Sequence, residues 1–327
     1  MAKANEFRPF EPHGDLADLL PAQTGNAING LGEAATRRPE VVFWAPDPAD
    51  IAFGDVQRWF YKSNPASPEE TQERARRQAI LDAPLPDLAP LPATSAPAEW
   101  TAGLNQFISA GECEQVGVAR MRPDWVFDHR EITYSNVIIL AVQHNYDQLK
   151  SAPEKTASAD VIRQYGRAAA VAKNVAGWIR EQGWDAEAVT GPMAGKLLLI
   201  PPALECGFGE LGKHGSLINP EFGSGFRLAA VLTDAPFAVT PKRQFGIDEF
   251  CQSCRVCENA CPPEAIAPEK QTVRGETKWY VDFDKCIPFF AETSGCAICI
   301  AVCPWSRPGV GLNLATKLAR RAERMDA

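Results

Sequence analysis

Eight of the ten cysteines lie in one stretch near the C-terminal end of the sequence, in two runs with related spacing. The runs read C-x2-C-x2-C-x3-C-P and C-x9-C-x2-C-x3-C-P. This is the pattern of bacterial proteins with two iron–sulfur clusters, in which the fourth cysteine of each run ligates the other cluster. We therefore predict two [4Fe–4S] clusters with crossed ligation. One would be held by Cys251, Cys254, Cys257 and Cys303, and the other by Cys286, Cys296, Cys299 and Cys261.

Two other uses of clustered cysteines fit this spacing less well. A zinc site would use one or two C-x2-C pairs with a longer spacer, not two runs that each end in Cys-Pro. A disulfide framework is typical of short secreted chains, and this sequence of 327 residues is not short. The pattern thus predicts one-electron transfer through the C-terminal region.

The composition bears on whether the protein binds nucleic acid, is exported or spans a membrane. The sequence has 33 basic and 41 acidic residues, a formal net charge of −8, which does not favour nucleic-acid binding. Residues 1–10 contain neither an apolar stretch nor a twin arginine, so no export signal is predicted. No apolar run approaches the ~20 residues that span a bilayer. We therefore expect a cytoplasmic protein without a membrane span.

Residues 1–98 are expected to form a proline-rich extension that wraps the main domain. One helix is predicted after Ser67, because Ser67 can cap it, Pro68 fits its first position, and Glu69 and Glu70 face its positive end. The stretch 83–97 contains five prolines and is expected to be an extended connector.

From Glu99 onward the pattern becomes α/β. The run 137–142 is continuously apolar, which is typical of a buried strand, and the polar residues Gln143, His144, Asn145 and Tyr146 follow it where α/β proteins place pockets. The other predicted elements are a helix over 101–110, strands over 114–121 and 227–233, and a long helix over 161–182. In the long helix the apolar positions step by three and four and predict one buried stripe: Val161, Tyr165, Ala168, Ala172, Val175 and Ile179.

The segment 207–212 matches the dinucleotide fingerprint G-x-G-x-x-G, but its context does not. That fingerprint needs a strand immediately before it and a helix immediately after it. Here Pro201 and Pro202 precede it, and the stretch 213–220 that follows is loop-like. We therefore predict no NAD or flavin site.

The stretch 206–223, CGFGELGKHGSLINPEFG, resembles a glycine-rich segment of the cobalamin-dependent reductive dehalogenases. The similarity continues through 227–237 into the first cysteine run, and the helix from Tyr165 to Gly183 resembles the family's Y-x17-G-[YW]-x-A helix. It covers about residues 100–305 and consists of four blocks in the family's order.

This resemblance implies an α+β protein in which a nitroreductase-like α/β domain binds cobalamin and a ferredoxin-like domain carries the two clusters. The expected domains are a cobalamin-binding catalytic domain over 99–245 and a ferredoxin-like domain over 246–327. A base-off corrinoid is implied, and no histidine lies in the D-x-H-x-x-G frame of the alternative binding mode. Because glycines permit close approach, the expected cobalamin contacts are Gly209, Gly212, Lys213, His214, Gly215 and Ser216.

The resemblance also implies two catalytic residues. Tyr165 matches the tyrosine that donates a proton to the carbon losing halide, and Arg227 matches the Lys or Arg that lies close to it. A neighbouring cation favours the ionised form of a phenol, whose ordinary pKa is near ~10. The expected reaction is reductive removal of halide from an aryl or other unsaturated carbon of an organohalide. A separate ferredoxin or flavodoxin would supply low-potential electrons.

Two alternative functions fit the sequence less well. An epoxyqueuosine reductase has a similar C-terminal half, including Cys-Pro-Trp at 303–305, but Val189 stands where its catalytic aspartate would be. A plain iron–sulfur electron carrier would not need the two-thirds of the chain that precede the cysteines. The sequence therefore favours the dehalogenase.

Overall fold

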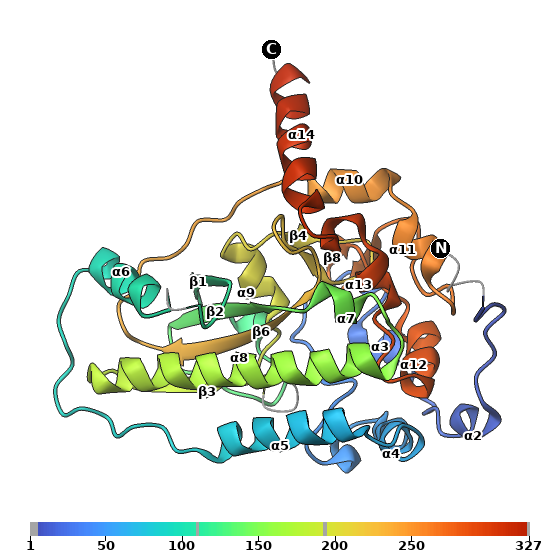
Figure 1. Ribbon diagram of the computed structural model, residues 1–327, viewed down its shortest axis with the longest axis horizontal. Coiled ribbons are helices and arrows are strands. Elements are labelled where there is room, and N and C mark those ends of the chain that lie inside the picture. The colour runs from blue at the N-terminus through green and yellow to red at the C-terminus, as the bar shows by residue number, and fades with distance from the viewer. Residues whose placement is uncertain (1–5, 109–110, 192–194, 326–327) are drawn as a thin grey trace.

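The computed structural model describes residues 6–108, 111–191 and 195–325 (Figure 1). Its centre is a four-stranded antiparallel sheet in the order β1-β2-β6-β3. The strands are β1 (Gln115–Arg120), β2 (Asn136–Gln143), β3 (Ala186–Val189) and β6 (Phe226–Thr233). In the central pair, Val142 near the end of β2 lies opposite Arg227 near the start of β6. This register brings the polar residues after β2 to the same edge as Arg227.

Both faces of the sheet are covered, which explains the continuous apolar run in β2. Ile138, Leu140 and Val142 face the long helix α8 (Lys155–Glu181), while Val137, Ile139 and Ala141 face a second core cluster. All six of these side chains are fully buried. The predicted buried strand is therefore confirmed, with one added residue at each end.

Helix α8 begins at Lys155, six residues before the predicted start, and its buried stripe differs from the predicted one at the N-terminal end. Ala168, Ala172, Val175 and Ile179 are buried as expected, but Val161 and Tyr165 are only partly buried. The helix predicted over 101–110 is α6 (Pro97–Ile108), and residues 109–110 lie outside the described residues.

The N-terminal 98 residues are more regular than their proline content predicts. They form α2 (Gly14–Ala17), α3 (Gly25–Asn29), η1 (Pro48–Asp50), α4 (Gly54–Ser63) and α5 (Pro68–Asp82). The predicted cap of α5 is confirmed: the Ser67 hydroxyl accepts from the Glu70 N–H at 3.1 Å, and the Glu70 carboxylate accepts from the Ser67 N–H at 2.7 Å. Helix α5 packs along α8 (Figure 1).

The stretch 83–96 is extended and is tied to the C-terminal end of α8. The Ala89 N–H donates to the Arg180 carbonyl at 3.0 Å, and the Ala93 N–H donates to the Gln182 carbonyl at 2.8 Å. The Trp184 indole N–H donates to the Ala93 carbonyl at 3.1 Å. These two backbone hydrogen bonds and one side-chain hydrogen bond hold the connector against the end of α8 and the residues that follow it.

Between the long helix and β6, the glycine-rich segment forms a small ladder. Helix α9 (Ile200–Glu205) precedes it, and β4 (Glu210–Leu211) pairs with β5 (Leu217–Ile218). Short elements also flank β2, namely η2 (Pro123–Trp125) before it and α7 (Tyr146–Leu149) after it. A helix, α9, thus precedes the segment 207–212, where a dinucleotide fingerprint would have a strand.

The C-terminal region packs against both the glycine-rich ladder and the N-terminal extension. Its elements are α10 (Ile247–Ser253), α11 (Val256–Ala260), β7 (Gln271–Val273), β8 (Glu276–Lys278), α12 (Phe283–Glu292), α13 (Ile298–Val302), η3 (Pro304–Ser306) and α14 (Val310–Met325). Helix α14 projects from the body of the molecule (Figure 1). Of the helices in the described residues, none is long and apolar enough to cross a membrane.

Candidate active site and cluster sites

A large cavity of about 1240 Å³ lies where the sheet domain, the N-terminal extension and the C-terminal region meet. Its wall includes Trp44, Tyr165, His214, Arg227, Cys286 and Cys299, which come from all three parts of the chain. Drug-sized ligand sites have volumes of ~300–1,000 Å³, so this cavity suits a larger group.

Tyr165 and Arg227 face each other in this wall. The Arg227 Cζ lies 4.9 Å from the centre of the Tyr165 ring, which is cation–π geometry. The Arg227 Nε is buried and has no hydrogen-bond partner among the described residues. Gly191, with φ +105°, also lies against the ring, since a Cβ there would come within 3.1 Å of the Tyr165 Cδ1. The structure thus brings together the two residues predicted to be catalytic.

A second guanidinium near Tyr165 was not anticipated from the sequence. The Arg77 Cζ, from α5, lies 6.0 Å from the centre of the Tyr165 ring. Burial lowers the pKa of Arg77, and the neighbouring tyrosines oppose this shift. The sequence could not predict this contact, because only the packing of α5 on α8 brings residues 77 and 165 together.

The six residues predicted to contact cobalamin divide into two sets. His214, Gly215 and Ser216 line the large cavity, whereas Gly209, Gly212 and Lys213 are not part of its wall. Gly209 and Gly212 instead allow β4 and β5 to pack closely, because a Cβ at either position would come within 2.4 Å of an atom of Ile218 in β5. Burial lowers the pKa of His214 to about 4, and its Nε2 lies 3.2 Å from the Ser224 hydroxyl.

The thiols of Cys251, Cys254, Cys257 and Cys303 surround one small cavity, together with Lys213, His214 and Trp305. Cys303 comes from the second cysteine run, and its charge interactions are with Cys251, Cys254 and Cys257. Burial raises the pKa of the Cys303 thiol to about 12. The structure therefore places the last cysteine of one run with the first three of the other.

The remaining four cysteines form a second group. Cys261 packs beside Cys286 and Cys299, and its charge acts on Cys286, Cys296 and Cys299. Cys286 and Cys299 also line the large cavity. Among the described residues, no three His, Cys, Asp or Glu side chains converge as ligands of a single metal ion. Two cysteines of the second group thus line the large cavity, and none of the first group does.

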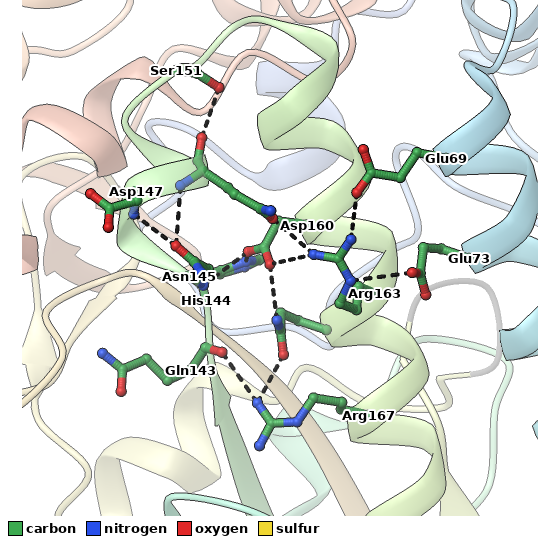
Figure 2. A network of polar contacts seen from close by, with 12 residues as sticks. Glu69, Glu73, Gln143, His144, Asn145, Asp147, Ser151, Asp160, Arg163 and Arg167 are labelled. Carbon is green, nitrogen blue, oxygen red and sulfur yellow. Dashed lines mark hydrogen bonds and ion pairs between the residues drawn. The ribbon is translucent and has the colours of Figure 1, made fainter.

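The polar residues after β2 form a network away from the cavity (Figure 2). His144 Nδ1 lies 2.7 Å from the Asp160 carboxylate, which also accepts from the Asn145 N–H at 3.1 Å and from the Gln164 amide at 3.0 Å. Burial lowers the pKa of His144 to about 4, although the Asp160 contact opposes this. Neither His144, Asn145 nor Tyr146 lines the large cavity, so the predicted pocket is not built from them.

The same network connects three elements. Arg163 on α8 contacts Asp160 and reaches Glu69 and Glu73 on α5, and Figure 2 shows these contacts together. The network therefore fixes the end of β2 and α5 against α8, close to the turn that carries Tyr165.

This chain is similar in sequence to an iron–sulfur domain family and to several reductive dehalogenases. A family model described as a 4Fe–4S dicluster domain matches residues 250–306. A tetrachloroethene reductive dehalogenase of Dehalobacter restrictus (strain DSM 9455 / PER-K23) is 35% identical over 217 residues, covering 62% of this chain and 39% of that protein. One of Sulfurospirillum multivorans is 27% identical over 333 residues, covering 86% of this chain and 64% of that protein. The chain thus spans about two-fifths of the length of the first of these relatives.

The fold of this chain is also similar to that of solved reductive dehalogenase structures. The catabolic reductive dehalogenase NpRdhA, in complex with 3-bromo-4-hydroxybenzoic acid, has a TM-score of 0.73 at 23% identity, covering 89% of this chain and 46% of that one. The likeness therefore includes the sheet domain as well as the cysteine-rich region. The chain is therefore similar in sequence to reductive dehalogenases and shares their fold, and its residues 250–306 match the 4Fe–4S dicluster domain.

Proposed function

We propose that this chain catalyses reductive dehalogenation of an organohalide. Electrons would pass through two [4Fe–4S] clusters to a corrinoid in the large cavity, and Tyr165 would donate the proton that replaces the halide. The observation that carries the proposal is the shared cavity wall. Tyr165 and Arg227 line the same space as Cys286 and Cys299, so a group bound there would adjoin both the proton donor and a cluster.

The residues of the cavity fit a base-off corrinoid. The volume of about 1240 Å³ exceeds that of drug-sized sites, and backbone at Gly215, with φ +72°, reaches the wall. His214 is an unsuitable lower ligand for cobalt, since both of its ring nitrogens already face hydrogen-bonding groups, the Ser216 N–H and the Ser224 hydroxyl. His214, Gly215 and Ser216 would contact the cofactor, which when bound would supply a reduced cobalt centre for removal of the halide.

Tyr165 and Arg227 would handle the proton. The phenol O–H of Tyr165 would donate to the carbon that loses halide, leaving a phenolate. The Arg227 guanidinium, 4.9 Å from the ring centre, would stabilise this negative charge at no cost of reorganisation. Because the Nε of Arg227 has no protein partner among the described residues, the side chain has donor capacity left for a bound group.

The proposed order of electron transfer is based on where the two cysteine groups lie relative to the large cavity. The cluster of Cys286, Cys296, Cys299 and Cys261 would be the last station, because two of its cysteines line the cavity. The cluster of Cys251, Cys254, Cys257 and Cys303 would receive electrons from an external ferredoxin or flavodoxin. We further propose the three-part division of the chain at 98 and 245, with a nitroreductase-like domain between the extension and the ferredoxin-like domain.

The substrate class is proposed from the relatives. Their names specify tetrachloroethene, and one related structure contains 3-bromo-4-hydroxybenzoic acid. An aryl or vinyl halide is therefore the expected class for this chain.

The test is anaerobic reconstitution followed by metal analysis and turnover. We expect about eight iron atoms and about one cobalt per chain, and halide release from a panel of halogenated phenols and alkenes with a chemical reductant. Uptake of iron without corrinoid would favour the electron carrier instead. Uptake of corrinoid with reduction of an epoxyqueuosine-modified RNA, but of no organohalide, would favour the epoxyqueuosine reductase.

A further inference from the structure

Lys213 is one of the largest fully buried side chains in the protein, with only 2% of its surface exposed. Lysine is rarely buried in this way unless a counter-charge accompanies it, because desolvation of an ammonium group is costly. The neighbours of Lys213 therefore indicate what its charge is for.

The protein supplies only a partial counter-charge. The Lys213 Nζ lies 3.8 Å from the Glu258 carboxylate, at the outer limit of an ion pair. The same carboxylate is 2.5 Å from the Arg255 guanidinium, so two cations share one anion. The Nζ also lies 5.1 Å from the centre of the Trp279 ring, which adds a cation–π contact but no negative charge.

The remaining neighbours are the cysteines of one cluster. Lys213 lines the small cavity formed by Cys251, Cys254, Cys257 and Cys303. Its side-chain charge acts on Cys251 and Cys257. Four thiolates and a [4Fe–4S] core carry net negative charge, which would complete the compensation of this ammonium group.

We propose that Lys213 sets the reduction potential of the cluster held by Cys251, Cys254, Cys257 and Cys303. Reduction adds one electron, taken from an external one-electron donor, and so makes the cluster more negative. A fixed cation at short range in a buried site favours that reduced form, as charge and hydrogen bonds around a cluster do generally. Lys213 thereby makes this cluster easier to reduce and supports its place as the entry point for electrons.

The effect is local to one cluster. Lys213 is not in the wall of the large cavity. The second group of cysteines has a different nearby cation, Arg8, whose Nη2 donates to the Cys261 carbonyl at 2.5 Å. Lys213 is therefore a positioning and tuning residue for one cluster, and the inference rests on the dicluster domain and not on the proposed dehalogenation.

The test is a redox titration of the reconstituted protein without corrinoid or organohalide, followed by electron paramagnetic resonance. A Cys254→Ser variant identifies the signal of the cluster concerned. In Lys213→Met the potential of this cluster should become more negative, and that of the other cluster should not change. Lys213→Arg, which keeps the charge, should restore most of the potential.

The matched control is Lys270→Met. Lys270 also lies over the Trp279 ring, at 5.5 Å, but it is ion-paired with Asp248 and is not part of the small cavity. This variant should leave both potentials unchanged. An unchanged potential in Lys213→Met with both clusters present would overturn the proposal, as would an equal shift of both clusters. If Lys213→Met fails to assemble the cluster, Lys213→Gln is titrated in its place, and loss of the cluster in both would show an assembly role instead.

Discussion

The guanidinium of Arg227 lies over the ring of Tyr165, with 4.9 Å between the Arg227 Cζ and the ring centre, and both side chains line one large cavity. The two residues are on different elements, β6 and α8, and 62 positions apart in the sequence. The fold thus places a partly buried guanidinium against the face of a phenol ring at the wall of a cavity of about 1240 Å³.

Replacement of Tyr165 by Phe should abolish most turnover and leave the rest of the protein intact. The change removes only the hydroxyl, so folding, iron content and corrinoid uptake should persist. General-acid catalysis contributes about 100- to 10,000-fold, and halide release should fall by about that factor. Tyr61→Phe is the control, since Tyr61 lies under Arg74 and outside the cavity wall. Equal rates for wild type and Tyr165→Phe on every substrate would assign the proton to another group.

Replacement of Arg227 by Leu should slow halide release by about 100-fold, because it removes the charge that we propose stabilises the Tyr165 phenolate. Arg227→Lys should be milder, since it keeps the charge and loses only the planar guanidinium. Arg74→Leu, which removes an arginine at 5.5 Å from the Tyr61 ring, should leave the rate unchanged. A loss in Arg227→Lys as large as in Arg227→Leu would show that guanidinium shape, not charge, is what matters.

Replacement of Cys261 by Ala should damage the cluster held by Cys286, Cys296 and Cys299. The cluster held by the other three cysteines of the first run should be spared. Cys261 lies beside Cys286 and Cys299, whereas Cys303 lies with the first run. Spectroscopy should show loss or conversion of one cluster, and about four irons should remain. Cys113→Ser, outside both groups, should retain both clusters. Selective loss of the cluster held by Cys251, Cys254 and Cys257 would contradict crossed ligation.

His144 should make the protein less stable in mild acid. Burial lowers the pKa of His144 to about 4, against about 6.5 for an exposed histidine. Between these values the unfolded chain binds a proton that the folded protein does not, so stability falls as the pH falls from about 6.5 toward 4. The loss should be roughly 1–3 kcal/mol across this window.

The measurement is the thermal midpoint from pH 7 to pH 4.5 for wild type and His144→Gln. The variant should have a lower midpoint at pH 7, because it disturbs the contact with Asp160, and a flatter pH dependence. His129→Gln is the control, since the His129 side chain is 93% exposed. A pH dependence as steep in His144→Gln as in wild type would place the titrating group elsewhere.

Some features were determined by the sequence alone, because they depend on chemistry between near neighbours. The C-x2-C steps specify a cluster because the ligands must lie on one short loop around it, and the family match to residues 250–306 agrees. The capping box at Ser67 depends on residues three apart, and the run in β2 predicts burial on both faces without knowledge of what covers them.

Other features were decided only by tertiary packing. Periodicity placed Tyr165 on the apolar stripe of α8, but this position is at the edge of the stripe, where the helix meets a cavity instead of the core. His144 follows a buried strand as pocket residues often do, yet Asp160 on α8 holds it away from the cavity. Arg77 lies near the Tyr165 ring, and Lys213 lies near the cysteines of one cluster site, only because elements distant in sequence pack together. A periodic pattern specifies which face of an element is buried, and only the assembled fold specifies what lies against that face.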